Sequence, residues 1–573
     1  MATQNEPDEA GFADLDPPPP PARRWPAILV GLALVALLLF ALADWWQQNR
    51  EATAYRAGVG EVAARHWAEA KADFTDAAGF SDAPALVLSA TTQLGRLEDG
   101  YRRMTAATQA GDLLGAWQQA RAVAGIQPDY RDIATRLDAA HRALFTQGLA
   151  GVVYLQTSGP QPGLHVIRPN GSPAYLPGTD RRSRVHTVAP DGRSFLYDVR
   201  LASGQRRLAV AGLRDGPPPA FAALPASFDP QAEGLFTAGG EIWASSGGGR
   251  TEELYDPALA TVAAKLRIPD GAVVLGASPD GSGLLLARSV PGATGAFSTT
   301  LILAAHEGAP LPAFALPGFL LTGDLSPDGR YATVLTEEAG AAITRTLYLI
   351  DLAAPRRPPQ ELDRIAWQGI TSAAQMRTTW LPGTPTGGLV LEHKDASGLT
   401  IFRYTLPSLV RSSVWAGHDV FQRDEQAALC PNGGALALRV QLDDRDYLAW
   451  VPLAGPSAFT LPFKFIDGQL AEPAFAPRGA YLIYSVRNPS GLDQGTTDTL
   501  YSLPVPPDGT APRLLARATR MYDSRLPTYA LAASGAMAAF VASGGDLHAR
   551  TLDGSADKVF AHGVAAVWAL AAR

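Results

Sequence analysis

From residue 151 to the end of the chain, apolar and polar residues alternate in short runs separated by glycine, proline and aspartate. Alternation with a period of two predicts β-strands, and the separating residues predict tight turns. One unit stands out, a Ser-Pro-Asp-Gly turn at 326–329 that leads into the apolar run Tyr331–Val334. Proline presets φ at the second turn position, aspartate hydrogen-bonds its own backbone, and glycine suits the last position. The unit therefore turns the chain into a strand.

The unit recurs through the C-terminal three quarters of the chain. Its second residue falls at positions 190, 230, 279, 327, 382, 431, 477 and 534, so the intervals run from 40 to 57 residues. A further strand follows each turn, as at Thr346–Leu352 and Tyr447–Leu453. Such an interval accommodates one four-stranded propeller blade. The copies, from clear to faint, are Ala189–Arg193, Ser278–Gly281, Ser326–Gly329, Cys430–Gly433, Ala476–Gly479, Asp229–Gln231, Leu381–Gly383 and Ala533–Gly535.

Two strands at the ends of this region have no turn unit of their own. Gly151–Leu155 comes before the first copy, and Val564–Leu570 follows the last. Pairing them in one blade would close the ring and remove open sheet edges. With that blade the units number nine at most. Because the faint copies carry little turn chemistry, we expect eight blades, with seven as the alternative.

The turn followed by a strand, and then by a strand such as Thr346–Leu352, resembles the TolB-like or WD40-like family of bacterial β-propellers. The resemblance covers residues 149–573 and implies a mainly β fold. It does not extend to the eukaryotic WD40 subclass, whose Trp-Asp and Gly-His signatures are missing at the expected places.

The N-terminal part is different. Residues 1–24 are acidic and proline-rich, which is typical of a disordered tail. The uncharged run Pro26–Ala43 is flanked by Trp25 and Trp45, so residues 25–46 are predicted to be a transmembrane helix. Ala41–Ala43 also fits a signal-peptidase site, and a cleaved signal is the alternative. Arginines 23 and 24 beside the helix favour a cytoplasmic tail and an extracytoplasmic propeller.

Residues 47–148 show apolar positions at helical spacing and form two similar halves. The first half contains His66–Ala70 and Phe80–Ala83, and the second contains Asp112–Ala116 and Tyr130–Ile133. They resemble degenerate tetratricopeptide-type repeats. We expect a small helical domain that acts as a spacer or docking platform, with a peptide-binding groove as the alternative.

Composition and the absence of certain motifs exclude several classes of function. A net charge of −7 gives no basic footprint for nucleic acid, so nucleic acid is not an expected partner. The single cysteine, Cys430, excludes an intrachain disulfide and a multi-cysteine metal site. No Gly-x-Ser-x-Gly elbow is present, and the nine histidines lack metal-ligand spacing.

The remaining polar features are interpreted as structural. The turn aspartates Asp191, Asp280 and Asp328 share one position of the repeat, which favours a turn-stabilising role over a catalytic one. The cluster Asp443–Asp446 is interpreted as an exposed hairpin tip rather than a calcium site. Cys430 stands in the serine position of its turn and is expected to be an inert thiol. The run Ser245–Gly249 is expected to be a hairpin rather than a phosphate loop.

No catalytic, cofactor-binding or metal-binding residue is therefore assigned. The sequence favours a membrane-anchored, non-catalytic scaffold that binds protein partners in a bacterial cell envelope through its propeller. The alternatives are a propeller enzyme with its site at the mouth of the central channel, and a sensor that binds a small ligand or glycan.

Overall fold

The structure is a computed structural model of the chain. It describes residues 25–189, 192, 194–212, 222–229, 234–237, 239–246, 250–257, 259–278, 280–292, 296–305, 314–352, 354, 357–367, 375–382, 388–395, 397–418, 421–422, 427–442, 445–453, 469–489, 496–505, 512–520, 527–542 and 544–569. The predicted tail at 1–24 lies outside these residues. Contacts between residues divide the chain into two compact units, the first comprising 1–103 and 119–134 and the second 104–118 and 135–573.

Five helices precede the strands. They are α1 (Trp25–Ala64), α2 (Trp67–Asp76), α3 (Ala83–Gln109), α4 (Leu113–Ile126) and α5 (Ile133–Thr146). Helix α1 is long and apolar enough to cross a membrane, and its side chains from Leu29 to Trp46 are exposed. This finding fits both a membrane anchor and a signal sequence.

The two similar halves of the helical sequence end in equivalent loops within the first unit. The Tyr55 hydroxyl donates a hydrogen bond to Asp82 Oδ1 (2.8 Å), and the Tyr101 hydroxyl donates one to Asp132 Oδ1 (2.5 Å). The serine before Asp82 has φ +45°, and Arg131 before Asp132 has φ +50°. The repeat seen in the sequence is therefore present in the structure, whereas membership of the tetratricopeptide family stays a prediction.

The strands form nine four-stranded antiparallel sheets over the described residues. These blades are numbered here in chain order. Blade 1 consists of β36 (Val564–Ala569), β1 (Val152–Gln156), β2 (Gly163–Ile167) and β3 (Pro173–Tyr175). Blade 2 consists of β4 (Val185–Val188), β5 (Ser194–Arg200), β6 (Arg206–Gly212) and β7 (Ala222–Ala223). Blade 3 consists of β8 (Leu235–Phe236), β9 (Ile242–Ser246), β10 (Thr251–Asp256) and β11 (Thr261–Arg267).

Blades 4 to 6 repeat the same meander. Blade 4 consists of β12 (Ala272–Ala277), β13 (Gly283–Pro291), β14 (Phe297–Ala305) and β15 (Phe314–Pro317). Blade 5 consists of β16 (Phe319–Leu325), β17 (Tyr331–Ala339), β18 (Ile343–Asp351) and β19 (Gln360–Trp367). Blade 6 consists of β20 (Gln375–Trp380), β21 (Gly388–Asp395), β22 (Gly398–Thr405) and β23 (Val410–His418).

The last three blades complete the ring. Blade 7 consists of β24 (Phe421–Gln422), β25 (Ala428–Leu429), β26 (Ala435–Leu442) and β27 (Arg445–Pro452). The two short strands β24 and β25 both pair with β26, which also pairs with β27. Blade 8 consists of β28 (Gln469–Phe475), β29 (Tyr481–Pro489), β30 (Thr496–Pro504) and β31 (Arg513–Arg520). Blade 9 consists of β32 (Tyr529–Leu531), β33 (Met537–Val541), β34 (Leu547–Thr551) and β35 (Asp557–Ala561).

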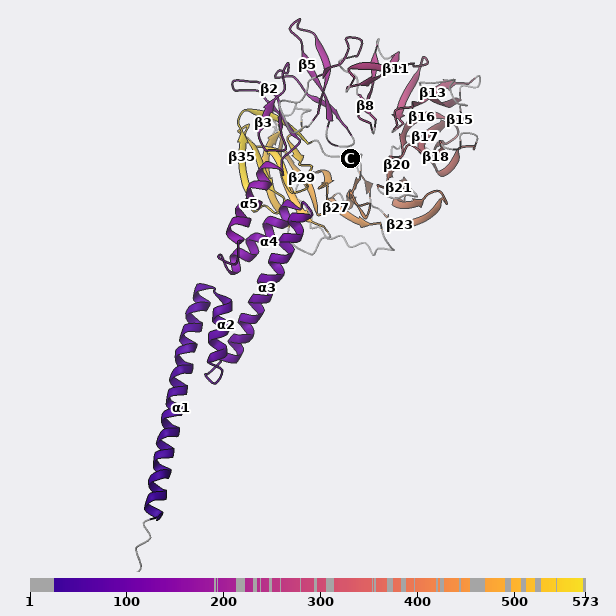
Figure 1. Cartoon of the computed structure of the whole chain (residues 1–573). Coiled ribbons are helices and arrows are strands. Elements are labelled where there is room, and N and C mark those ends of the chain that lie inside the picture. The colour runs from indigo at the N-terminus through magenta and orange to yellow at the C-terminus, as the bar shows by residue number, and fades with distance from the viewer. Residues whose placement is uncertain are drawn as a thin grey trace, which may run out of the picture. The chain divides into compact units, whose positions relative to one another are not determined.

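The sheets follow one another around a ring, and the last sheet lies beside the first (Figure 1). First strands of successive blades are in contact, as β12 is with β16, so the first strand of each blade lies nearest the axis. The predicted closure is confirmed, because β36 pairs antiparallel with β1 and places Val567 opposite Tyr154. The fold is thus a β-propeller in which the C-terminal strand supplies the innermost strand of blade 1.

The turn unit has the predicted geometry. The backbone N–H of Gly329 donates to Ser326 O (2.8 Å), and Gly329 has φ +67°. Asp328 Oδ1 accepts hydrogen bonds from the Ser326 hydroxyl (2.5 Å) and the Arg330 N–H (3.1 Å). The same backbone bond joins Gly281 to Ser278 and Gly433 to Cys430. Each of these turns connects the first and second strands of a blade.

The expected number of blades, eight or seven, is wrong, because the described residues form nine blades, including those in which the turn unit is faint or lies elsewhere. In the last of them, the Gly535 N–H donates to Ala532 O (2.9 Å) between β32 and β33. In blade 3 the turn lies at 237–240, where the Gly240 N–H donates to Thr237 O (3.1 Å), and not at Asp229. Other residues of that copy, 230 and 231, lie outside the described residues.

Helical residues of the second unit pack on blades 8 and 9 at the end where a turn joins the first and second strands. Trp117 and Phe145 are buried in one cluster with residues of blade 9. The Arg478 guanidinium, which lies in the turn of blade 8, donates to Gly111 O (2.7 Å), and the Ser534 hydroxyl in the turn of blade 9 donates to Gly148 O (2.7 Å). Gln118 Nε2 donates to Asp553 Oδ2 (2.9 Å). The propeller therefore carries part of the helical region as a packed element.

Candidate functional site

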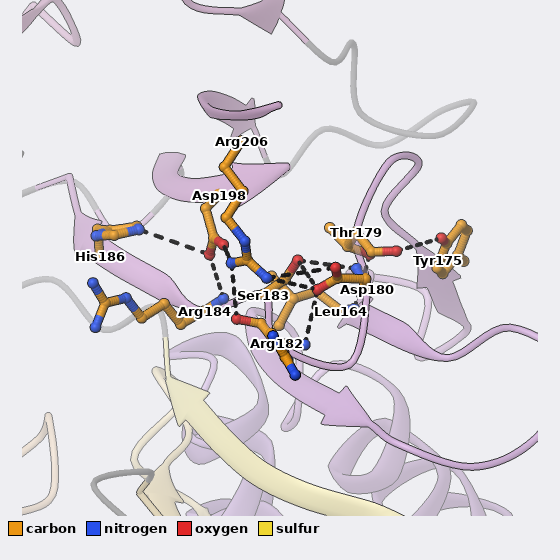
Figure 2. A network of polar contacts seen from close by, with 10 residues as sticks. All are labelled: Leu164, Tyr175, Thr179, Asp180, Arg182, Ser183, Arg184, His186, Asp198 and Arg206. Atoms are coloured by element: carbon orange, nitrogen blue, oxygen red, sulfur yellow. Dashed lines mark hydrogen bonds and ion pairs between the residues drawn. The ribbon is translucent and has the colours of Figure 1, made fainter. Parts of the chain in front are cut away.

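A charged network occupies the junction of blades 1 and 2, around the connection from β3 to β4 (Figure 2). Asp180 gives this connection its local shape. Its Oδ1 accepts the backbone N–H of Arg182 (2.8 Å), and its own N–H donates to Ser183 Oγ (3.0 Å). Aspartate and serine form such turns because their short side chains reach the backbone two or three residues away. The turn places the side chains at 180–184 at one end of both blades.

The other end of the connection is tied to blade 1. The Thr179 hydroxyl donates to Leu176 O (2.7 Å) and accepts the Leu164 N–H (2.9 Å). The Tyr175 hydroxyl donates to Thr179 O (2.9 Å). These bonds fix the segment before Asp180 against β2 and β3, and Figure 2 shows those that join Thr179 to Leu164 and Tyr175.

Asp198 on β5 is the centre of the network. Its side chain is 4% exposed and binds the guanidinium of Arg206, which lies on the neighbouring strand β6. Asp198 Oδ1 also accepts the backbone N–H of Arg184 (2.5 Å). His186 Nε2 lies 3.7 Å from Asp198 Oδ1 and is buried without a hydrogen bond to the described residues. A buried carboxylate needs such compensation, so the network holds the connection onto blade 2.

Arg206 joins the two aspartates. Its Nη2 lies 3.1 Å from Asp180 Oδ1, and its Nη1 donates to Arg182 O (3.2 Å) as well as to Asp198. The guanidinium is planar with several donors, which allows it to serve three acceptors at once. One arginine therefore links β5, β6 and the β3–β4 connection.

An open cavity of about 850 Å³ lies beside this network. Its walls come from the β1–β2 turn at 160–162, the β3–β4 connection at 179–182 and the β5–β6 end at 200–206. Four arginines and one carboxylate line it: Arg181, Arg182, Arg200, Arg206 and Asp180. We call this cavity the arginine pocket. Its volume is typical of sites that hold a ligand or a peptide segment.

His165 stands behind the pocket wall. Its ring stacks on Tyr154 (centroids 5.1 Å apart) and lies beside Tyr175 (5.4 Å), and Nε2 is 2.9 Å from Gln161 O. Burial lowers the pKa of His165 and raises the pKa of Tyr154 to about 12. Both side chains are therefore uncharged near neutral pH, and the positive charge of the site comes from the arginines.

The polar residues singled out in the sequence lie elsewhere. Asp280 and Asp328 are engaged in their turns, and hydrogen bonds from Ser282 lower the pKa of Asp280. Cys430 is 2% exposed, and burial raises the pKa of its thiol. Asp191 and positions 443, 444 and 247–249 lie outside the described residues. Among the described residues, no group of three or more His, Cys, Asp or Glu side chains could hold a metal ion.

Sequence reasoning missed the arginine pocket. A signal existed in the segment from 180 to 207, where six described residues are arginines in an acidic chain: Arg181, Arg182, Arg184, Arg200, Arg206 and Arg207. Its meaning depends on which of these arginines are paired, and only the fold decides that.

Comparison with known proteins finds distant structural similarities only. No family model matches the chain, and no curated protein matches it. Among solved structures, the putative TolB from Agrobacterium tumefaciens is similar at 15% identity over 44% of this chain and 83% of that chain, with a TM-score of 0.25. TolB from Acinetobacter baumannii is similar at 14% identity over 57% and 78%, with a TM-score of 0.25. A putative dipeptidyl aminopeptidase IV from Bacteroides ovatus is similar at 10% identity over 62% and 55%, with a TM-score of 0.41.

The protein is thus a β-propeller with an N-terminal apolar helix, and TolB proteins are among the structures it resembles. At these identities and TM-scores the likenesses assign no partner, substrate or activity to the chain.

Proposed function

We propose that the chain is a membrane-anchored, non-catalytic interaction protein whose propeller binds protein partners in a bacterial cell envelope. In this proposal residues 1–24 are a cytoplasmic tail, residues 25–46 span the membrane, and the propeller is extracytoplasmic. The tetratricopeptide-like helices at 47–148 act as a spacer and docking platform between the span and the propeller.

The observation that supports this proposal most is the exposed apolar surface of α1. Leu37 is 66% exposed and Phe40 is 76% exposed, on a stretch whose described side chains are uncharged up to Asp44. An uncovered apolar surface of this kind is unstable in water, and a helix satisfies its own backbone hydrogen bonds in a bilayer. An uncleaved α1 would attach a closed propeller to a membrane.

A propeller suits a binding role because its loops are mounted on a closed, rigid framework. The arginine pocket is formed by such loops, and its described groups provide positive charge and hydrogen-bond donors. These are means of recognising a partner rather than of breaking a covalent bond. The pocket is therefore the contact we assign to binding.

Three measurements on the full chain test the proposal. The mass of the mature protein in membranes distinguishes an anchor, which retains residues 25–46, from a cleaved signal ending at Ala43. Protease added to spheroplasts should digest or release the propeller, and protection would reverse the orientation. Cross-linking in membranes followed by affinity purification and mass spectrometry should recover reproducible protein partners, and recovery of none would contradict the binding role.

A further inference from the structure

Three arginines of the pocket carry positive charge that the described residues do not neutralise. Arg181 and Arg182 lie on the β3–β4 connection, and Arg200 ends β5. All three are exposed, and their guanidinium groups form no ion pair with any described residue. Arg206, by contrast, is engaged by Asp180 and Asp198. The pocket is therefore a positively charged concavity in a chain whose net charge is −7.

The backbone that carries these arginines is held in place. The Arg182 N–H and the Arg182 carbonyl are both bonded within the network, to Asp180 and Arg206. The Arg200 N–H donates to Gly178 O (2.7 Å), which joins the end of β5 to the same connection. Fixed attachment points reduce the entropy lost when the side chains bind a ligand. The pocket is in this sense prepared for an anion.

We propose that the arginine pocket binds the carboxylate side chains of an acidic segment presented by a protein partner. The guanidinium fork pairs with carboxylates through two parallel hydrogen bonds. The cavity is open and much larger than one small anion, so it can take a stretch of chain. Pro160, Pro162 and Tyr175 add apolar surface to its wall, which suits a peptide backbone. That the acidic segment belongs to a protein rests on the proposed function above.

The test uses the full chain in detergent and a fluorescent synthetic peptide in which glutamate and serine alternate. Fluorescence anisotropy at low salt should show binding that weakens as salt is added, and the same peptide with glutamine in place of glutamate should not bind. The double variant Arg181→Ser/Arg200→Ser should weaken binding about tenfold or more, because two charge-assisted contacts are removed. Neither side chain belongs to the Asp198 network, so the variant should fold.

A matched control removes the same charge from blade 3. Arg250 and Arg267 are exposed and form no ion pair with the described residues, so Arg250→Ser/Arg267→Ser should bind the peptide as the wild type does. Equal losses in both double variants would overturn the proposal in favour of general charge attraction. Unchanged binding in the pocket variant would also overturn it.

Two further probes separate the sources of negative charge. Inorganic phosphate and vesicles containing an anionic phospholipid should compete poorly with the peptide, and competition by either that is lost in the pocket variant would assign the pocket to phosphate instead. The result is distinct from that of the partner search. If the peptide binds at the pocket and membranes yield no partner, the proposed function fails and the pocket assignment stands. If partners are recovered equally well with the wild type and the pocket variant, the proposed function stands and the pocket assignment fails.

Discussion

Removing the carboxylate of Asp198 should loosen the junction of blades 1 and 2. Asp198→Ala deprives the Arg206 guanidinium and the Arg184 N–H of their buried acceptor. Breaking a buried ion pair from one side typically costs about 3–5 kcal/mol. Arg206 is 35% exposed and keeps Asp180 as a partner, so part of its charge can be solvated again. We therefore expect a loss of about 2–3 kcal/mol of local stability.

Hydrogen exchange of the full chain measures this loss where it occurs. If the β3–β4 connection opens locally, 2–3 kcal/mol corresponds to exchange that is faster by about 30- to 150-fold in peptides covering 176–212. The control is Glu361→Ala. Both side chains of the Glu361–Arg364 ion pair are exposed, so the pair should contribute less than about 1 kcal/mol to stability. Unchanged exchange in blades 1 and 2 would refute the reasoning. An equal increase in all blades would also refute it, since it would mean that Asp198 stabilises the whole ring rather than this junction.

Three further predictions concern the packing of the second unit. Trp117→Ala should loosen the helical residues from the propeller by about 3–5 kcal/mol, seen as faster proteolysis at 104–118, whereas Leu88→Ala at an exposed helix position should have little effect. Ala566→Asp places an unpaired charge at a fully buried position of β36 and should open the ring, seen as aggregation in size-exclusion chromatography, whereas Val559→Asp on the exposed face of β35 should not. His165 has a lowered pKa in the folded state, so the folded state binds fewer protons than the unfolded state below about pH 6.5, and stability should fall as the pH drops through that value. Melting curves of His165→Phe, measured over the same pH range, should show a smaller fall.

The repeat could be predicted from sequence because each turn depends on local chemistry, and the closure of the ring could be predicted because the strands at the two ends have no turn unit of their own. The number of blades could not, and the reason lies in what the turn requires. At Ser326–Gly329 the serine and aspartate add hydrogen bonds, but the backbone condition is a glycine with positive φ at the last position. Gly240 and Gly535 meet this condition with φ +85° and +67° without any Ser-Pro-Asp sequence. A blade can therefore have this turn where the sequence carries only a faint copy, as at Gly535, or no copy at all, as at Gly240.

The arginine pocket could not be predicted because its charge depends on pairing between strands. Arg206 and Arg207 are neighbours in sequence, yet only Arg206 reaches Asp180 and Asp198. Asp180 and Asp198 are separated by eighteen positions and meet at one guanidinium because the pairing of β5 with β6 puts Arg206 beside Asp198, and the β3–β4 connection brings Asp180 to the same arginine. Arginine density in the sequence indicates that charge is present. The fold determines that Arg206 is paired and that Arg181, Arg182 and Arg200 line the cavity without an ion pair to a described residue.

Strand direction places the pocket and the packed helices on different faces of the propeller. In an antiparallel meander, the turns between first and second strands emerge at one end of the blade, and the turns between second and third strands emerge at the other. Arg478 and Ser534 lie in turns of the first kind and contact the helical residues. Arg200 and Gly204 lie at a turn of the second kind and line the pocket. Because the packed helices and the pocket use opposite ends of the strands and different blades, an acidic segment can occupy the pocket while residues 104–118 and 135–148 stay bound to the propeller.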